Sequence, residues 1–259
     1  MTFLTDFGTK DGYVAQMKGV ALSITDVQLV DITHDISPQN IYEGAFALRS
    51  TVSSFPVGTV HVAVVDPGVG TKRRGIIITT KDHILVGPDN GLLIPASRNL
   101  GNFAVYEITN KEYMRQTISP TFHGRDIFTP VAAHILEGVP FEEFGQMITD
   151  FAELDFGAAE ITDKTAIGAI LAMDHFGNVI TNIDGDALKK ALPYGKTITL
   201  VIGNKKRKIL FLKAYNFVKK GQLLTTIGSS NLLEVGLNQG NVAQKLKIKP
   251  GDKVKIIFS

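Results

Sequence analysis

The sequence predicts an α/β fold, with a mainly parallel sheet in an N-terminal domain and a smaller, β-barrel-like C-terminal domain. In the first 65 residues, short apolar runs alternate with segments of helical periodicity, a pattern typical of parallel strands joined by right-handed crossovers. From Ala166 onward the pattern changes to short strands separated by glycine-containing turns. We therefore predict an N-terminal domain over 1–150, a linker over 151–164 and a C-terminal domain over 165–259.

The distribution of charge supports this division. Residues 1–159 hold 11 Lys+Arg and 18 Asp+Glu, a net charge of −7, whereas residues 160–259 hold 16 and 7, a net charge of +9. Such a difference between halves indicates two domains, and it favours head-to-tail contact between the acidic domain of one subunit and the basic domain of another.

The individual elements follow from apolar spacing and turn residues. Short apolar runs rich in β-branched residues predict strands, and in the N-terminal domain they lie at Thr2–Thr5, Val27–Ile32, Thr59–Val65, Gly75–Thr80, His83–Val86 and Phe103–Ile108. Apolar residues at helical spacing predict helices over 14–24, over 40–54 and over 128–136, the last with Pro130 in its first turn. In the C-terminal domain we expect no strong, long helix except near 184–192.

Composition excludes several classes of function. There is no cysteine, so disulfides, thiol nucleophiles and zinc–thiolate sites are excluded. No apolar run reaches 18 residues and no basic leader precedes the first strand, so we expect a cytoplasmic protein without a membrane span. The sequence lacks HExxH, EF-hand, GxGxxG, Walker and G-x-S-x-G motifs, so we expect no metal and no phosphate-binding or serine-nucleophile chemistry.

The densest basic patch is Lys205-Lys206-Arg207-Lys208. One interpretation is a nucleic-acid-binding surface, and the other is a solvated hairpin that turns at Gly203-Asn204. No aromatic stacking pattern or nucleic-acid-binding motif accompanies the patch, which favours the hairpin. We expect no nucleic-acid partner.

The strongest candidate for a functional site is the segment from Val64 to Arg74. An apolar strand ends at Asp66, a Pro67-Gly68 turn follows, and two arginines close the segment. Ligands of open α/β sheets bind outside the carboxyl ends of the strands, so Asp66 with Arg73 folded back over it would face such a crevice. The alternative is that Asp66 caps a turn and that the arginines are solvated. Asp6 and Asp174 also follow predicted strands, and Asp11 lies at the start of a predicted helix.

Six segments in order along the chain resemble the S-adenosylmethionine hydroxide adenosyltransferase family, whose relatives include the bacterial fluorinase and chlorinase. The segments are Thr5–Asp11, Val65–Arg73, Pro88–Leu93, Thr121–Asp126, Asp174–Asn178, and Gly228–Ser230 with Asn238–Gly240. The resemblance extends from the first strand to about Ala243. It implies an enzyme that hydrolyses S-adenosyl-L-methionine (SAM) to adenosine and L-methionine by attack of water or hydroxide at the ribose C5′ carbon.

The resemblance also implies roles for individual residues. The hydrolase branch carries an Asp-Arg-His triad, which matches Asp66, Arg73 and His123. The halogenases have a tyrosine at the position of Asp66, and the fluorinase has a serine at that of Gly124. A carboxylate at the nucleophile position repels a halide and favours water. The sequence leaves open whether Asp66 or His123 accepts the proton.

The resemblance also implies which residues bind each of three parts of the substrate. Asp6 would accept hydrogen bonds from the ribose diol. Asp11 and Asp174 would pair with the methionine ammonium group and Ser229 with its carboxylate, although Gln39 and Ser230 differ from the fluorinase tryptophan and arginine at this end. The remaining implied contacts of the adenosyl group are Phe122, Phe176, Asn178, Tyr215 and Gln239.

The family resemblance further implies a homotrimer in which SAM lies between the N-terminal domain of one subunit and the C-terminal domain of its neighbour. SAM is then the substrate, and no metal or other cofactor is expected. Two alternatives to the hydrolase stay open at this point: a SAM-dependent halogenase or dehalogenase, and a non-catalytic sensor of SAM or adenosine.

Overall fold

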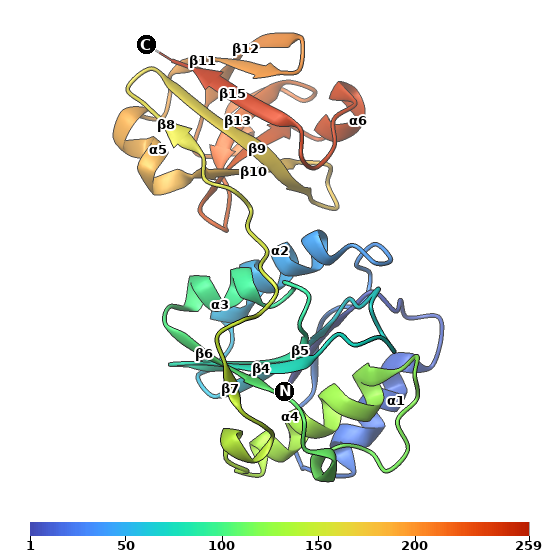
Figure 1. Ribbon diagram of the computed structural model, residues 1–259. Helices are drawn as coiled ribbons and strands as arrows, with labels where there is room; N and C mark the ends of the chain where they lie inside the picture. The colour runs from blue at the N-terminus through green and yellow to red at the C-terminus, as the bar shows by residue number, and fades with distance from the viewer. Residues whose placement is uncertain (259) are drawn as a thin grey trace. The chain divides into compact units, whose positions relative to one another are not determined.

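The computed structural model describes residues 1–258, which form two compact units (Figure 1). The first unit is Met1–Asp155 and the second begins at Phe156. The first is a layered α/β unit and the second is a closed β-barrel, so the predicted α/β class with a β-barrel-like C-terminal part is confirmed. Among the described residues, no helix combines the length and the apolar character needed to cross a membrane.

The first unit is built on a seven-stranded sheet of order β2-β1-β3-β5-β4-β6-β7. Its strands are β1 (Thr2–Thr5), β2 (Val30–Thr33), β3 (Thr59–Val64), β4 (Gly75–Thr80), β5 (His83–Pro88), β6 (Phe103–Glu107) and β7 (Met147–Ile148). The pairs within β2-β1-β3-β5 are parallel, whereas β4 pairs antiparallel with β5 and β6, and β6 with β7. The sheet is therefore mixed rather than mainly parallel, because a connection as short as that from Thr80 to His83 can join only antiparallel strands.

Four helices cover the two faces of this sheet (Figure 1). Helices α1 (Tyr13–Leu22) and α4 (Thr129–Leu136) lie on one face, and α2 (Ile41–Thr51) and α3 (Ile94–Leu100) lie on the other. On the α1/α4 face, Met17, Val62 and Phe128 belong to one buried apolar cluster. On the α2 face, a Cβ at Gly44 would come within 2.9 Å of both Leu92 and Val65, so this glycine lets the helix approach the sheet closely.

Several boundaries differ from those predicted. Strand β2 begins at Val30, three residues later than expected, and helix α2 ends at Thr51, where a 3₁₀ turn over Val52–Ser54 follows. Helix α3 was not predicted, because the apolar run before it resembles a strand and Pro95 in its first turn resembles a break. A π-helical turn over Gly124–Phe128 precedes α4, so the helical segment starts before Phe128.

The second unit is a barrel of seven strands, as the pattern of short strands and glycine turns predicts. Its strands are β9 (Thr165–Met173), β10 (Val179–Asp184), β11 (Thr197–Ile202), β12 (Lys205–Phe211), β13 (Leu223–Ile227), β14 (Leu232–Leu237) and β15 (Lys253–Ile257). The order β10-β14-β13-β12-β11-β15-β9 closes through pairing of β9 with β10, and β8 (Glu160–Ile161) adds to β9. Barrel closure leaves no free edge in this ring, and Ile170, Phe211 and Val254 are among the buried residues inside it.

Two short α-helices and the basic patch also belong to this unit. Helix α5 (Gly185–Ala191) lies within the predicted range, and α6 (Val242–Leu246) follows β14. The four residues Lys205–Lys208 are exposed at the start of β12, where Lys205 pairs with Ile202 across the Gly203-Asn204 turn. The patch is therefore one strand of the expected hairpin.

Candidate active site

The loop after β3 brings Arg73 back onto Asp66. The Nε of Arg73 donates to Oδ1 of Asp66 at 3.1 Å, and its Nη2 donates to Oδ2, so the contact is bidentate. Only 9% of the Arg73 side chain and 4% of the Asp66 side chain are exposed. Gly70 makes this return possible: its φ is +77°, and a Cβ there would lie 2.3 Å from the carbonyl oxygen of Pro120. The pair is thus a largely buried ion pair, not a cap beside solvated arginines.

His123 joins this pair from a segment 50 residues further along the chain. The Nη2 of Arg73 lies 3.1 Å from Nδ1 of His123. A guanidinium group only donates, so Nδ1 is the acceptor and the neutral ring carries its proton on Nε2. Burial, and then the positive charge of Arg73, lower the pKa of His123, while Asp66 and Asp126 oppose this shift. The lowered pKa of His123 favours a neutral imidazole near neutral pH.

A pocket of about 300 Å³ opens over this triad in the first unit. Asp6, Asp66, Phe122 and His123 line it together with Phe7 and Gln39, whereas Arg73 lies behind Asp66. Oδ2 of Asp6 accepts a hydrogen bond from the backbone N–H of Gln39 at 2.7 Å. The pocket therefore combines two carboxylates, an imidazole and an aromatic wall.

That aromatic wall is a cluster of edge-to-face rings. The ring of Phe122 lies 5.7 Å from that of Phe7 and 5.3 Å from that of Tyr13. The Arg125 guanidinium lies 4.9 Å from the centre of the Phe122 ring on which it packs. Asp11, which the resemblance places at the methionine end, is exposed in the turn before α1 and does not line this pocket.

The segment that carries His123 is anchored by a buried carboxylate. Asp126 is fully buried and accepts from Nε and Nη2 of Arg125 at 2.7 and 3.0 Å, and from the backbone N–H of Ser119 at 2.8 Å. Arg115 adds a longer contact at 3.3 Å. The Arg125-Asp126 part of the Thr121–Asp126 motif therefore holds the backbone next to His123.

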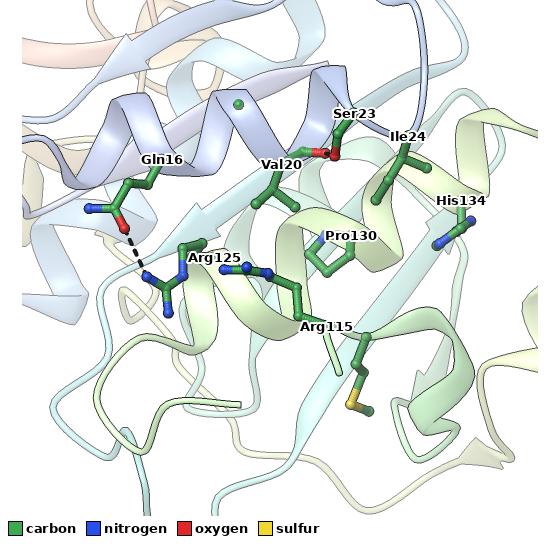
Figure 2. Close-up of a pocket in the computed structure, with 10 residues that line it drawn as sticks. Gln16, Val20, Ser23, Ile24, Arg115, Arg125, Pro130 and His134 are labelled. Carbon is green, nitrogen blue, oxygen red and sulfur yellow. Dashed lines mark hydrogen bonds between the residues drawn. The ribbon is translucent and has the colours of Figure 1, made fainter. Parts of the chain in front are cut away.

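These arginines border a second concavity of about 320 Å³, between α1 and the start of α4 (Figure 2). Figure 2 shows Arg125 bonded to Gln16 of α1, with a distance of 2.8 Å from Nη1 to Oε1. Arg115, Pro130 and His134 also line it. None of the predicted site residues lines this concavity.

The second unit contains a separate pocket of about 590 Å³. Four predicted residues, Phe176, Asn178, Tyr215 and Gln239, line it. Asp174 bonds to one of these lining residues: its two carboxylate oxygens accept from the backbone N–H and the side-chain amide of Asn178, each at 2.8 Å. Ser229 is exposed in the turn between β13 and β14 and does not line this pocket.

Sequence reasoning missed Glu234, which supports Tyr215. The Tyr215 hydroxyl donates to Oε1 of Glu234 on β14. Burial and the nearby charge of Asp174 raise the pKa of Glu234, although the Tyr215 hydrogen bond opposes the shift. Gly236 leaves room for the tyrosine, because a Cβ there would lie 2.3 Å from the ring. The signal for Glu234 was available: it is the one charged residue in the apolar run Leu232–Leu237.

The described residues contain no group of three or more His, Cys, Asp or Glu side chains arranged to hold a metal ion. Most of the predicted site residues thus fall into two sets, one at the triad pocket of the first unit and one at the Tyr215 pocket of the second unit. Asp11 and Ser229 line neither pocket.

Family comparison accounts for both units. Residues 1–145 match the N-terminal domain model of the SAM hydroxide adenosyltransferases, and residues 168–255 match the C-terminal domain model. The chain belongs to this family. The resemblance identified in the sequence is therefore confirmed.

Individual members of the family align over nearly the whole chain. The chain is 36% identical to an (R)-S-adenosyl-L-methionine hydrolase of Salinispora arenicola, over 99% of this chain and 97% of the relative. It is 37% identical to a protein of the same name from Methanocaldococcus jannaschii (100% and 95%), and 28% identical to a fluorinase of Actinopolyspora mzabensis (100% and 97%). A crystal structure of an uncharacterized conserved protein from Thermotoga maritima superposes with a TM-score of 0.95 at 37% identity, covering 99% of both chains.

Proposed function

We propose that this family member hydrolyses SAM to adenosine and L-methionine. The observation that carries the proposal is the Asp66–Arg73–His123 triad at the edge of a pocket that also holds Asp6. Homologues that are named SAM hydrolases support it, at 32–37% identity.

In the proposed reaction, a water molecule near Asp66 attacks the ribose C5′ carbon in line with the C–S bond. The new C5′–O bond forms as the C5′–S bond breaks, and methionine leaves as a neutral thioether. The sulfonium is already a good leaving group, so no general acid is required. A positioned water and an acceptor for its proton are required, and general-base catalysis of this kind contributes roughly 10²–10⁴-fold.

Asp66 is the proposed proton acceptor. His123 presents Nδ1 to the Arg73 guanidinium, so the lone pair that would take a proton is already occupied, and its Nε2–H is a donor. Arg73 stays protonated and cannot serve as a base. Each carboxylate oxygen of Asp66 keeps a further lone pair beside its bond to Arg73. Arg73 and His123 then orient Asp66 and the water.

The other predicted residues are proposed to hold the substrate. Asp6 would accept from the ribose diol, with Phe122 beside it, while Asn178 and Gln239 would contact adenine and Phe176 and Tyr215 would pack on it. At the methionine end, Asp11 and Asp174 are proposed to pair with the ammonium group and Ser229 with the carboxylate. Asp174 already accepts two bonds from Asn178, so an ammonium group would use its remaining lone pairs.

We further propose a homotrimer in which the first unit of one subunit and the second unit of a neighbour enclose SAM. Each unit holds a pocket lined by part of the predicted set, and the opposite charges of −7 and +9 in the two halves favour such contact. In this proposal SAM is a substrate, no metal or other cofactor takes part, no nucleic acid binds, and the enzyme works in the cytoplasm. Sedimentation of the purified protein tests the assembly.

The proposed reaction is tested by incubating the purified protein with SAM in H₂¹⁸O, with and without chloride. Chromatography and mass spectrometry should give methionine and adenosine labelled at the 5′ oxygen, independent of halide. A 5′-halonucleoside would support a halogenase instead. Tight binding of SAM without turnover would support a sensor.

A further inference from the structure

The segment Pro88–Gly91, at the end of β5, lies next to the triad but lines neither candidate pocket. It belongs to the family-like motifs, yet the proposed function gives it no role. Its two polar residues, Asp89 and Asn90, are partly buried and contact both ends of the Asp66–Arg73 loop: the Asn90 side chain bonds to the backbone of Val65, and Asp89 bonds to Arg74 through its backbone N–H and its carboxylate.

Asn90 holds the point at which the chain leaves the sheet. Its side-chain N–H donates to the carbonyl oxygen of Val65 at 2.9 Å, and its Oδ1 accepts from the backbone N–H of Leu92 at 3.2 Å. Val65 is fully buried and directly precedes Asp66. The amide of Asn90 therefore satisfies a buried carbonyl and fixes the direction in which Asp66 leaves β3.

Asp89 holds the other end of the loop. Its backbone N–H donates to the carbonyl oxygen of Arg74 at 3.0 Å, and Nη1 of Arg73 donates to that same oxygen at 2.9 Å. The Asp89 carboxylate pairs with Arg74, at 2.8 Å between Oδ2 and Nη2. The carbonyl that orients the Arg73 guanidinium is thus itself held by Asp89.

We infer that Asp89 and Asn90 are positioning residues of the active site. By fixing Val65 and Arg74, the backbone neighbours of Asp66 and Arg73, they make the guanidinium meet the carboxylate and His123 in a single arrangement. The inference rests on the proposed function, because it assigns these residues to the geometry of the hydrolytic triad.

Asn90→Asp is the sharpest test. Aspartate has the same size and still accepts from Leu92, but it replaces the donor to Val65 with an oxygen that repels that carbonyl. Asn110 offers a matched control: its Oδ1 accepts from the backbone N–H of Glu112 at 3.0 Å and its amide donates to the carbonyl of Glu143 at 2.9 Å. Asn110 is also partly buried but lines neither pocket, so Asn110→Asp makes the same chemical change elsewhere in the first unit.

We expect kcat for SAM to fall about 10- to 100-fold in Asn90→Asp with KM nearly unchanged, because small misplacements of reacting groups cost rates of this order. Asn110→Asp should keep the activity of the wild type. Equal kcat in the two variants would overturn the inference. Asn90→Ala, which also removes the donor but introduces no charge, should show the same direction of change if Asn90→Asp fails to fold.

A titration of His123 by NMR tests the placement of Arg73 without turnover. The charged groups that act on His123 are Arg73, Asp66 and Asp126, and only Arg73 lowers its pKa through charge. If Arg73 moves away in Asn90→Ala, which adds no charge of its own, the pKa of His123 should rise relative to both the wild type and Asn110→Ala. An unchanged pKa would contradict the inference. A wild-type protein that does not hydrolyse SAM would instead refute the proposed function, while this titration would still decide the role of Asn90.

Discussion

The pockets of the two units are formed by different kinds of side chain. In the first unit, a bidentate ion pair and an imidazole lie at the wall of a pocket of about 300 Å³. In the second unit, a larger pocket of about 590 Å³ is lined by two aromatic rings, amide side chains and Leu237. The two carboxylates next to it do not line it: Asp174 bonds to the lining residue Asn178, and Glu234 bonds to the lining residue Tyr215. The first arrangement suits bond breaking, and the second suits recognition of a flat ring.

The largest effect should come from Asp66→Asn. The amide has the same shape but cannot accept the proton of water, so we expect kcat to fall by about 10²–10⁴-fold. Calorimetry should still detect SAM binding, because the pocket of the second unit is untouched. A loss of SAM binding as large as the loss of kcat would show that Asp66 only builds the pocket. The two pockets would then not differ in chemistry and recognition.

Arg73→Lys should be the next most damaging change. Lysine cannot donate at once to Asp66, His123 and the Arg74 carbonyl in the planar geometry that arginine provides. We expect kcat to fall about 10²-fold, as for other misplaced catalytic groups. The control is Arg98→Lys, which alters an exposed ion pair with Glu153. Steady-state kinetics of the two variants should differ in kcat, and similar values would argue against a role for the guanidinium fork.

Acid should weaken the first unit through its buried histidines. His61 is fully buried between Thr2 and His83, and burial, followed by the charge of His83, lowers its pKa to about 3. The unfolded chain binds a proton at its ordinary pKa of about 6.5, so stability should fall by up to about 1.4 kcal/mol per pH unit between pH 6.5 and 3.

Denaturant unfolding of the wild type and His61→Asn at several pH values measures this slope. The slope should be smaller in the variant. Hydrogen exchange should show the acid-induced loss in the first unit, because the one histidine of the second unit, His175, is exposed. A loss confined to the second unit would contradict the prediction.

The smallest effect should come from removing the residue that accepts a hydrogen bond from the Tyr215 hydroxyl. Glu234→Ala removes the acceptor of its hydroxyl, and a net hydrogen bond of about 1 kcal/mol corresponds to a roughly fivefold rise in KM for SAM. We expect kcat to stay near the wild-type value. Glu234→Gln keeps an acceptor oxygen and should bind almost normally. A drop in kcat in Glu234→Ala would show that the second unit also contributes to the chemical step.

Local pattern was enough to predict most elements of the first unit and the strand-rich character of the second. The strands β1, β3 and β4 are short apolar runs bounded by turns, and such runs are visible without tertiary information. Helix α3 could not be separated from a strand, because its first residues continue an apolar run. The antiparallel half of the first sheet was likewise underestimated, because strand order depends on which edges meet in space.

The site divides in the same way. The position of Asp66 at a strand end, the turn after it and the family motifs were properties of the sequence alone. Only the tertiary structure decided that His123 meets Arg73 across 50 residues, that Asn90 bonds to the backbone of Val65, and that Glu234 supports Tyr215. These contacts join segments distant along the chain, so they arise from packing of whole elements, which local propensity does not determine.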